Sequence, residues 1–483
     1  MTEPASSEAA PLAFDFIPNH IQLLVRHTQA LSADHFGALT QALTTQLGRH
    51  VRQRGEALTF NTNRQPAFSI LPLEVETGST LQTVIDALNR LTGESLTGLL
   101  QNSAFPTQAW QGQTQPLVAE PNWFTMSSNH GQGTGGTGSW PTPGDPNAPD
   151  PSQAAPLIQG SSKEPVTLVM LDTHLTSAGQ AHIPSHLLNR LTFQMPMPAS
   201  VHLDIAGHHV NGHQYLLTSH GVFGAYQAIR LIDKLAAANP NTVDPNQIHI
   251  TIYEALNHFG VGSVAWICQI LHTLSQQLAA TPQRIVINLS LVLHAPAGGA
   301  TALQAICDML ESQGAAIVAA AGNEAQRSYN AGLPRPEPMQ PAAFGSVIGV
   351  SALAIDSSGG LNSAPYSNLS DGLTSTPPQR AGFAAIGGGV TAFNNATQVY
   401  EASTPEVNGP FVDVFPGGQA NSKHWAFWSG TSFAAPRLSA LAAVLLSTGA
   451  HALNASLRQV IEAEILQHYT SGLTAHHEPK MEA

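Results

Sequence analysis

The stretch Val166–Asp172, VTLVMLD, places a run of apolar and β-branched residues directly before an aspartate. Similar runs recur at 248–253, 284–291, 315–322 and 346–353. Continuous runs of this kind are typical of parallel strands that are buried on both faces of a sheet. Helical patterns lie between them, at 221–238, 261–280 and 300–313. The alternation of strand and helix predicts an α/β fold with a doubly wound, mostly parallel sheet.

Length and composition limit the class of protein. The chain has 483 residues, 42% of them hydrophobic and 10% charged, and these values indicate a globular protein with more than one domain. The net charge is −13, and no block of Lys and Arg is present. We therefore expect neither nucleic acid nor an anionic membrane surface as the main partner.

The ends and the cysteines indicate an intracellular protein. The start, MTEPASSEAAPLAFDF, lacks the basic segment and apolar run of a secretory signal. No apolar run approaches the roughly 18 residues of a membrane-spanning helix. The two cysteines, Cys268 and Cys307, lie in apolar helical patterns and are interpreted as buried thiols. We expect a cytoplasmic location.

A segment rich in Gly, Pro, Ser and Asn divides the chain. It reads GQGTGGTGSWPTPGDPNAPDPSQAAP from Gly131 to Pro156 and is interpreted as a linker or tether. The predicted organisation is a small α+β domain, the linker, the large α/β domain and a polar tail, at 1–130, 131–162, 163–470 and 471–483.

The N-terminal unit mixes strand and helix patterns. We predict strands at 20–27 and 67–75 and a probable edge strand at 116–124. A helix follows Ser32 as its cap, and a second helix at 78–93 is expected to stop at Gly93. The expected inward positions are Phe36, Leu39, Leu43, Leu47, Leu81, Val84, Ile85, Leu88 and Leu91.

Four polar residues stand where a parallel sheet places its chemistry, outside the carboxyl ends of the strands or at helix starts. Asp172 and Asn323 follow predicted strands, and His220 and Ser432 open predicted helices. A serine hydroxyl needs a base, His is the usual base near neutral pH, and a buried Asp orients the imidazole. An Asn amide and a backbone N–H at a helix N-terminus can stabilise an oxyanion. Each residue alone fits a capping or turn role better, and only the combination favours catalysis.

At these residues the chain resembles the subtilase family of subtilisin-like serine proteases. The resemblance runs from about residue 165 to about 450 in the order Asp, His, Asn, Ser, and its blocks are LVMLDTHL, SHGVFGAYQAI, IVAAAGNE and WSGTSFAAPRLSALAAVLL. It implies a subtilisin-like fold with Asp172, His220 and Ser432 as the triad and Asn323 as oxyanion donor. It also implies that two strands flank the substrate, at Ser290, Leu291, Val292, Ala320, Ala321 and Gly322.

The N-terminal unit is similar to the prodomains of this family through PLVAEPNW. The resemblance implies that the unit docks on two surface helices and acts as an intramolecular inhibitor or folding chaperone. The segment FTMSSNHG, from Phe124 to Gly131, would then be the tail that enters the cleft.

The sequence also departs from the family pattern. His174 stands where a glycine is usual, Val222 and Phe223 follow Gly221 in place of Thr-His, and Val292-Leu293-His294 replaces Gly-Gly. We expect the side chains after Ser290 to crowd the groove in which a substrate strand pairs.

Two alternatives concern single residues. Asp204, in SVHLDIAGHH, also follows a strand-like run and is a rival to Asp172 as the triad acid. His208, His209 and His213 suggest a metal site, but Asn211 and Gly212 disfavour the helix that i,i+4 ligands need, so we predict no metal ligands. His476 and His477 lie in the polar tail and are expected to be solvated. No cofactor is expected for catalysis. No calcium-loop pattern is present, and the sequence leaves open whether the protein binds structural calcium.

The sequence supports two functions. The first is a serine endopeptidase acting on protein or peptide substrates and restrained by its N-terminal domain. The second is a subtilase-shaped binding or regulatory protein with little turnover, whose cleft is permanently occupied by its own N-terminal segment.

Overall fold

The computed structural model describes Phe16 to Ile461 with gaps. The gaps are 61–66, 77–79, 102, 104, 111–112, 114, 128–138, 149–157, 159, 161–162, 207–215, 294, 297, 326–327, 329–333, 356–359, 371–381, 395–398, 403–406, 416–417 and 450–457. The polar tail at 471–483, His208, His209, His213, His476 and His477 lie outside the described residues.

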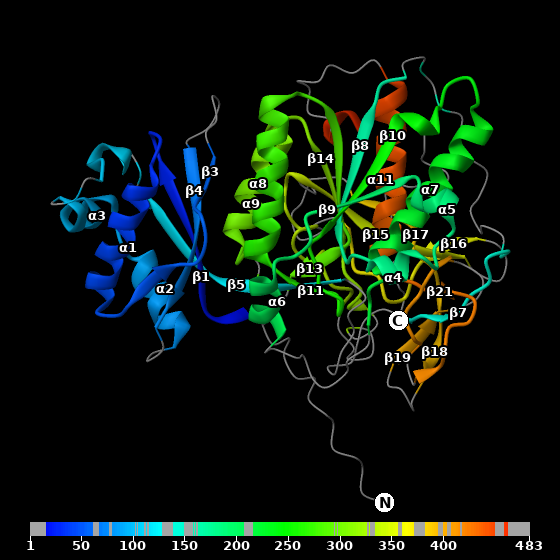
Figure 1. Ribbon diagram of the computed structural model, residues 1–483, viewed down its shortest axis with the longest axis horizontal. Helices are drawn as coiled ribbons and strands as arrows, with labels where there is room; N and C mark the ends of the chain where they lie inside the picture. Colours follow the sequence, from blue (N-terminus) through cyan, green and yellow to red (C-terminus); the bar gives the residue numbers. More distant parts are fainter. Residues whose placement is uncertain are drawn as a thin grey trace, which may run out of the picture.

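An eight-stranded, largely parallel sheet forms the centre of the large domain, in the order β16-β15-β14-β12-β8-β10-β9 with β17 beside β15 (Figure 1). The five predicted runs are confirmed as its strands: β8 (Val166–Asp172), β10 (Ile248–Glu254), β12 (Arg284–Leu289), β14 (Ala316–Ala320) and β15 (Val347–Ile355). The others are β9 (Leu191–Gln194), β16 (Leu361–Ser363) and β17 (Phe383–Ile386), and β16 alone pairs antiparallel within this sheet.

Helices cover both faces of this sheet (Figure 1). On one face lie α8 (Val264–Ala280) and α9 (Thr301–Ser312), and on the other lie α7 (His220–Ala238) and α11 (Thr431–Thr448). Alternate residues of β8 pack against the two helix layers. Val169 and Leu171 pack with α8 and α9, whereas Leu168 and Met170 pack with α7 and α11. A strand buried on both faces must be apolar throughout, which explains the continuous runs in the sequence.

The remaining elements of the large domain are short. They comprise the helices α4 (Ser177–Gln180), α5 (Ser185–Leu188) and α6 (Ala199–Ala206), the turn η2 (Pro245–Gln247), and two three-stranded sheets built from β18 (Val390–Asn394), β19 (Val399–Ala402), β6 (Ser139–Trp140), β20 (Asn408–Pro410), β21 (Trp425–Phe427) and β7 (Thr142–Pro143). None of the helices in the described part of the chain combines the length and the apolar character needed to cross a membrane.

The N-terminal unit is a separate β-rich domain, drawn in blue in Figure 1. Its strands are β1 (Phe16–His27), β2 (Val51–Gln53), β3 (Leu58–Phe60), β4 (Ala67–Val75) and β5 (Leu117–Ser127). Its helices are α1 (Ala33–Leu47), α2 (Leu81–Asn89) and α3 (Gly93–Leu100), with the turn η1 (Thr107–Trp110). Ser32 caps α1 as predicted, and the predicted inward residues are buried, except that Leu47 and Leu81 are only partly covered.

One strand joins the two bodies. The first part of β5 pairs antiparallel with β1, from Leu117 onward. Its last residues pair with β11 (Val261–Ser263) and with β13 (Leu291–Leu293) of the large domain. The strand predicted at 116–124 is therefore an edge strand in its first part, and it continues beyond the predicted end to Ser127, where Thr125 and Met126 lie between two partner strands.

Polar side chains of β5 also satisfy the starts of α8 and α9. The Glu120 carboxylate accepts hydrogen bonds from the backbone N–H groups of Thr301 (2.6 Å) and Ala302 (3.1 Å). The Asn122 Oδ1 atom accepts one from the N–H of Ala265 (3.0 Å). The first N–H groups of a helix have no partner within the helix, so these acceptors replace water there.

Three other expectations need correction. The predicted helix 261–280 begins only at Val264, because Val261–Ser263 form β11, which pairs with β5, and Ser263 is the helix cap. Gly93 does not stop a helix, since α2 ends at Asn89 and Gly93 opens α3 after its cap Thr92. Within the predicted linker, Ser139–Pro143 is not a free tether, because β6 and β7 pair with strands of the large domain.

The carboxyl of Glu120 provides a test of the contact between β5 and the starts of α8 and α9. Burial raises its pKa from 4.5 to about 7. Between these values the folded chain holds a proton that the unfolded chain has released, so the contribution of Glu120 to stability is highest below pH 4.5 and decreases as the pH rises to 7. We expect Glu120→Gln to remove about 3 kcal/mol of this pH dependence, measured as the denaturant midpoint of the full chain across this window. Equal slopes for the variant and the wild type would contradict the assignment.

Candidate active site

Asp172 and His220 form a buried pair at the carboxyl end of the sheet. Asp172 is the last residue of β8, and His220 is the first residue of α7. The His220 Nδ1 atom lies 2.7 Å from Asp172 Oδ1, and neither side chain is exposed to solvent. Among the described residues, the other ring nitrogen, Nε2, is buried without a hydrogen-bond partner. The carboxylate fixes the Nδ1–H tautomer, which leaves Nε2 available as a base.

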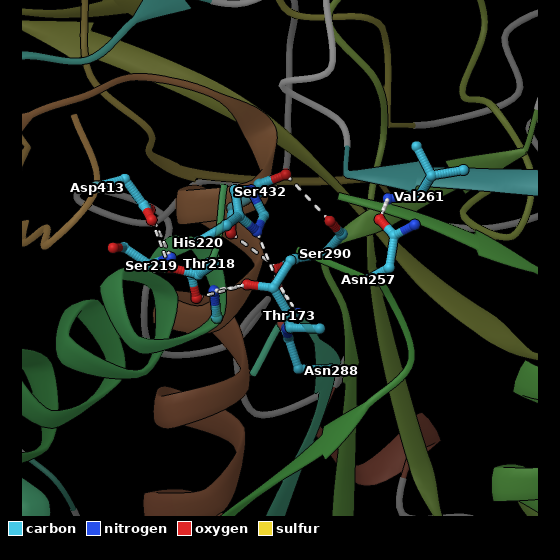
Figure 2. A network of polar contacts seen from close by, with 12 residues as sticks. Thr173, Thr218, Ser219, His220, Asn257, Val261, Asn288, Ser290, Asp413 and Ser432 are labelled. Atoms are coloured by element: carbon cyan, nitrogen blue, oxygen red, sulfur yellow. Dashed lines mark hydrogen bonds and ion pairs between the residues drawn. The ribbon is translucent and has the colours of Figure 1, made fainter. Parts of the chain in front are cut away.

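The turn that carries His220 is held by side chains from two directions (Figure 2). The Thr173 hydroxyl donates to the Thr218 carbonyl (3.1 Å) and accepts from the Gly221 N–H (3.0 Å). Gly221 is required there, because a Cβ atom would meet the Thr173 carbonyl oxygen at 2.4 Å. The chain therefore brings α7 into direct contact with the end of β8.

From the opposite side, Asp413 accepts two hydrogen bonds from the same turn. Its Oδ2 atom accepts from the Ser219 N–H (2.9 Å), and its Oδ1 atom accepts from the Thr218 hydroxyl. The Ser219 hydroxyl in turn accepts from the Val412 N–H (2.9 Å). The buried carboxylate of Asp413 thus fixes the turn that directly precedes His220.

Ser432 lies at the N-terminus of α11, beside the ring of His220 (Figure 2). The residue after it, Phe433, packs its ring 5.2 Å from the imidazole. The Ser432 hydroxyl donates to the carbonyl oxygen of Ser290 (3.1 Å), and the Ser290 hydroxyl donates to the carbonyl oxygen of Ser432 (2.8 Å). The helix start supplies backbone N–H groups and a positive dipole end next to the hydroxyl.

Asn323 follows β14 and faces the same helix start. Its Oδ1 atom accepts from the N–H (2.9 Å) and the hydroxyl (3.0 Å) of Thr431, the residue before Ser432. The Thr431 hydroxyl also accepts from the Gly322 N–H (3.2 Å). With its oxygen bound to these donors, the amide of Asn323 has its Nδ2 donor turned away from Thr431.

The predicted substrate strands are only partly brought together. Ser290 precedes β13, and Leu291 and Val292 within it pair with Ser127 and Met126 of β5. The other flank of β5 is β11, which the sequence reasoning placed inside a helix, while Ala320, Ala321 and Gly322 make no pair with β5. The expected crowding after Ser290 does not prevent strand pairing with β5, because the side chains of Leu291 and Leu293 are buried in the core.

The structure also bears on the alternative interpretations of Asp204 and of a metal site. Asp204 lies in α6, a helix, and not at the end of a strand as its sequence suggests. Burial lowers the pKa of His174, whose ring packs edge-on against Phe193. In the described segments, no group of three or more His, Cys, Asp or Glu side chains is arranged to hold a metal ion.

The sequence reasoning missed two kinds of supporting residue. Asp413 stands in the segment FVDVFPGG, and no role was predicted for this aspartate from the sequence. Asn288 donates to the Ser290 hydroxyl (2.9 Å), and Ser439 donates to Asn288 (3.1 Å), which ties β12 to α11. A buried polar residue inside an apolar strand, such as Asn288 in RIVINL, was the available signal, since such groups need partners.

Comparisons with known proteins gave one family match and several structural likenesses. Residues 260–477 match the profile of the Subtilase family. A sequence search among curated proteins gave no significant match. Among solved structures, the chain resembles sphericase (19% identity, 65% of this chain and 90% of that chain, TM-score 0.42) and fervidolysin from Fervidobacterium pennivorans, a keratinolytic enzyme related to subtilisin (13%, 90% and 56%, 0.43). A lanthipeptide protease gives 20% identity, 59% and 75% coverage and a TM-score of 0.37. At these scores the structural likenesses carry no argument about activity.

The family match indicates the class of subtilisin-like serine proteases for the matched part of the chain. The matched segment, residues 260–477, covers less than half of the 483 residues; it contains Asn323 and Ser432, while Asp172 and His220 precede it.

Asp413 offers a test of the supporting contacts. We expect Asp413→Asn to lower the free energy of unfolding by about 2 kcal/mol, because one of the two donors then faces an amide NH₂ in place of a charged acceptor. Chemical denaturation of the full chain measures this change. The neighbouring Val414 is 49% exposed, so Val414→Ala is the control and should leave stability unchanged. Equal stability of both variants would show that Asp413 is dispensable.

Proposed function

We propose that this protein is a serine endopeptidase that uses Asp172, His220 and Ser432 as a triad and Asn323 as an oxyanion donor. The observation that carries the proposal is the buried hydrogen bond of 2.7 Å between Asp172 and His220, with the second ring nitrogen unpaired within the described residues and Ser432 beside it. A cytoplasmic location and catalysis without a cofactor are part of the same proposal.

The chemistry follows from these positions. Nε2 of His220 takes the proton of the Ser432 hydroxyl as Oγ bonds to the peptide carbonyl carbon. Asp172 stabilises the imidazolium that forms. The Asn323 amide and the Ser432 backbone N–H bind the oxyanion. The imidazolium then protonates the leaving amine, and water repeats the sequence on the acyl-enzyme.

Activation has one geometric requirement. The Ser432 hydroxyl donates to the Ser290 carbonyl in this structure, so it must exchange this acceptor for Nε2 of His220 before it attacks. Rotation about one side-chain bond of a serine is a small change, and the unpaired Nε2 gives the hydroxyl a stronger acceptor.

A fluorophosphonate probe tests the nucleophile. We expect labelling of the full chain to be lost in Ser432→Ala and to slow by about a thousandfold or more in His220→Ala. Asn323→Ala should lose about a hundredfold, the usual cost of one oxyanion donor. Ser447→Ala, at the far end of α11, is the control and should label at the rate of the wild type. Labelling that persists in Ser432→Ala would reject Ser432 as the nucleophile.

We further propose that the N-terminal domain restrains this site through β5. Phe124 and Met126 belong to the apolar core of the large domain and are nearly inaccessible to solvent. The Trp123 indole N–H donates to the Gly299 carbonyl (2.5 Å), and Thr59 of β3 accepts from the His272 ring on α8 (3.1 Å). A substrate strand would need the backbone groups of β11 and β13 that β5 now uses.

The same occupancy supports the second function, a binding or regulatory protein whose cleft stays closed. In that case β5 is a permanent strand of the fold, and the pairs at Met126 with Val261 and Val292 never open. The two functions predict different responses when β5 is weakened.

Met126→Asp distinguishes them. A carboxylate at this buried position is costly, so β5 should leave β11 and β13 more often. For a restrained protease, we expect probe labelling of Ser432 to rise by about tenfold or more. Gln46→Asp on the exposed face of α1 is the matched control and should change nothing. Labelling that stays absent or unchanged in a folded Met126→Asp chain would favour the permanently closed protein.

A further inference from the structure

The segment that follows the N-terminal domain is built into the large domain. β6 pairs in parallel with β19 through Ser139 and Trp140, and β7 pairs with β21 through Thr142 and Pro143. The Gly144 N–H donates to the Trp425 carbonyl (3.0 Å). A Cβ atom at Gly144 would lie 2.6 Å from the Ala426 carbonyl carbon, so the two backbones are in close contact.

Ser139 makes four polar contacts with two neighbouring residues. Its carbonyl oxygen accepts from the Trp428 indole N–H (2.8 Å). Its hydroxyl accepts from the Ser429 N–H (3.0 Å), lies 2.5 Å from the Ser429 hydroxyl, and donates to the Ser429 carbonyl (3.3 Å). All three residues are buried, so these bonds are shielded from water.

Trp428 lies between this contact and the catalytic pair. Its ring packs edge-on against the His220 ring at 5.4 Å and lies 5.0 Å from the Phe433 ring. The turn that it opens, Trp428–Gly430, runs directly into Thr431 and Ser432. On the other side the turn is fixed by the bonds from the Trp428 N–H to Val407 and from the Gly430 N–H to Gly387.

We propose that Ser139 is a positioning residue for the reaction, acting through Trp428 and Ser429 on both His220 and Ser432. The inference rests on the proposed function and names a residue outside the four catalytic ones. Ser139 touches neither β11 nor β13 among the contacts described above, so it should affect the chemical step and not the binding of the substrate strand.

One consequence concerns where the catalytically active part of the chain begins. Ser127 ends β5 in the cleft, and Ser139 opens β6 on the large domain. A cut that removes the N-terminal domain and keeps activity must therefore hydrolyse a peptide bond between Ser127 and Ser139. A chain that begins after Gly144 would contain all four catalytic residues but would lack the support of Trp428 and Ser429.

The test compares Ser139→Ala with Ser275→Ala in the full chain. Ser275 is also buried and also donates a side-chain hydrogen bond, to Gln313 (2.9 Å), but it lies on α8 away from the turn. Saturation kinetics of fluorophosphonate labelling separate probe binding from the bond-forming rate. We expect Ser139→Ala to lower the maximal labelling rate about tenfold with unchanged half-saturation, and Ser275→Ala to change neither.

The readouts separate positioning from folding and from the proposed function. A folding defect lowers the fraction of chain that is labelled and leaves the rate constant unchanged, and that result would overturn the proposal. A wild-type rate in Ser139→Ala would also overturn it. The far-downfield NMR signal of the His220 Nδ1 proton, identified by its loss in Asp172→Asn, gives a second measurement. It should shift or broaden in Ser139→Ala alone, even if the wild type were not labelled and the protease proposal had failed; an unchanged signal would reject the positioning role.

Discussion

The structure depends on one strand that belongs to two sheets. β5 begins as a neighbour of β1 and ends between β11 and β13. Two strands that face each other across a gap present unpaired N–H and C=O groups, and burying such groups without partners costs free energy. Phe124 and Met126 complete the apolar core below the same strands. The backbone hydrogen bonds of β5 and its apolar packing therefore both hold the N-terminal domain against β11 and β13.

The geometry of the candidate active site depends on buried polar groups that are satisfied by neighbours far away in the sequence. Asp413 reaches the turn before His220, Asn323 reaches the helix start before Ser432, and Ser139 reaches the residues that lead into it. In a low-dielectric interior an unpaired polar group is costly and a complete network is rigid. These contacts fix the backbone positions from which the imidazole and the hydroxyl extend.

Much of this arrangement could be predicted from the sequence, for physical reasons. Strands buried on both faces must be apolar, so the apolar run before Asp172 predicted a strand. A helix cap such as Ser32 acts on residues only a few positions away, so it too could be predicted. Contacts between distant segments leave no comparable local pattern. β11 has three residues and depends on a partner strand, Gly93 opens a helix that its neighbours define, and Ser139 lies in a segment whose composition resembles a linker.

Ser290 links the pairing of β5 with β13 to the hydroxyl of Ser432, the proposed nucleophile. Its carbonyl oxygen accepts the Ser432 hydroxyl, its own hydroxyl returns a hydrogen bond to the Ser432 backbone, and the next residue begins the strand that pairs with β5. A change in what pairs with β13 would therefore act next to the residue that accepts the Ser432 hydroxyl. Since Asn288 and Ser439 anchor Ser290 to α11, a short chain of buried hydrogen bonds connects the strand that pairs with β5 to the helix that carries Ser432.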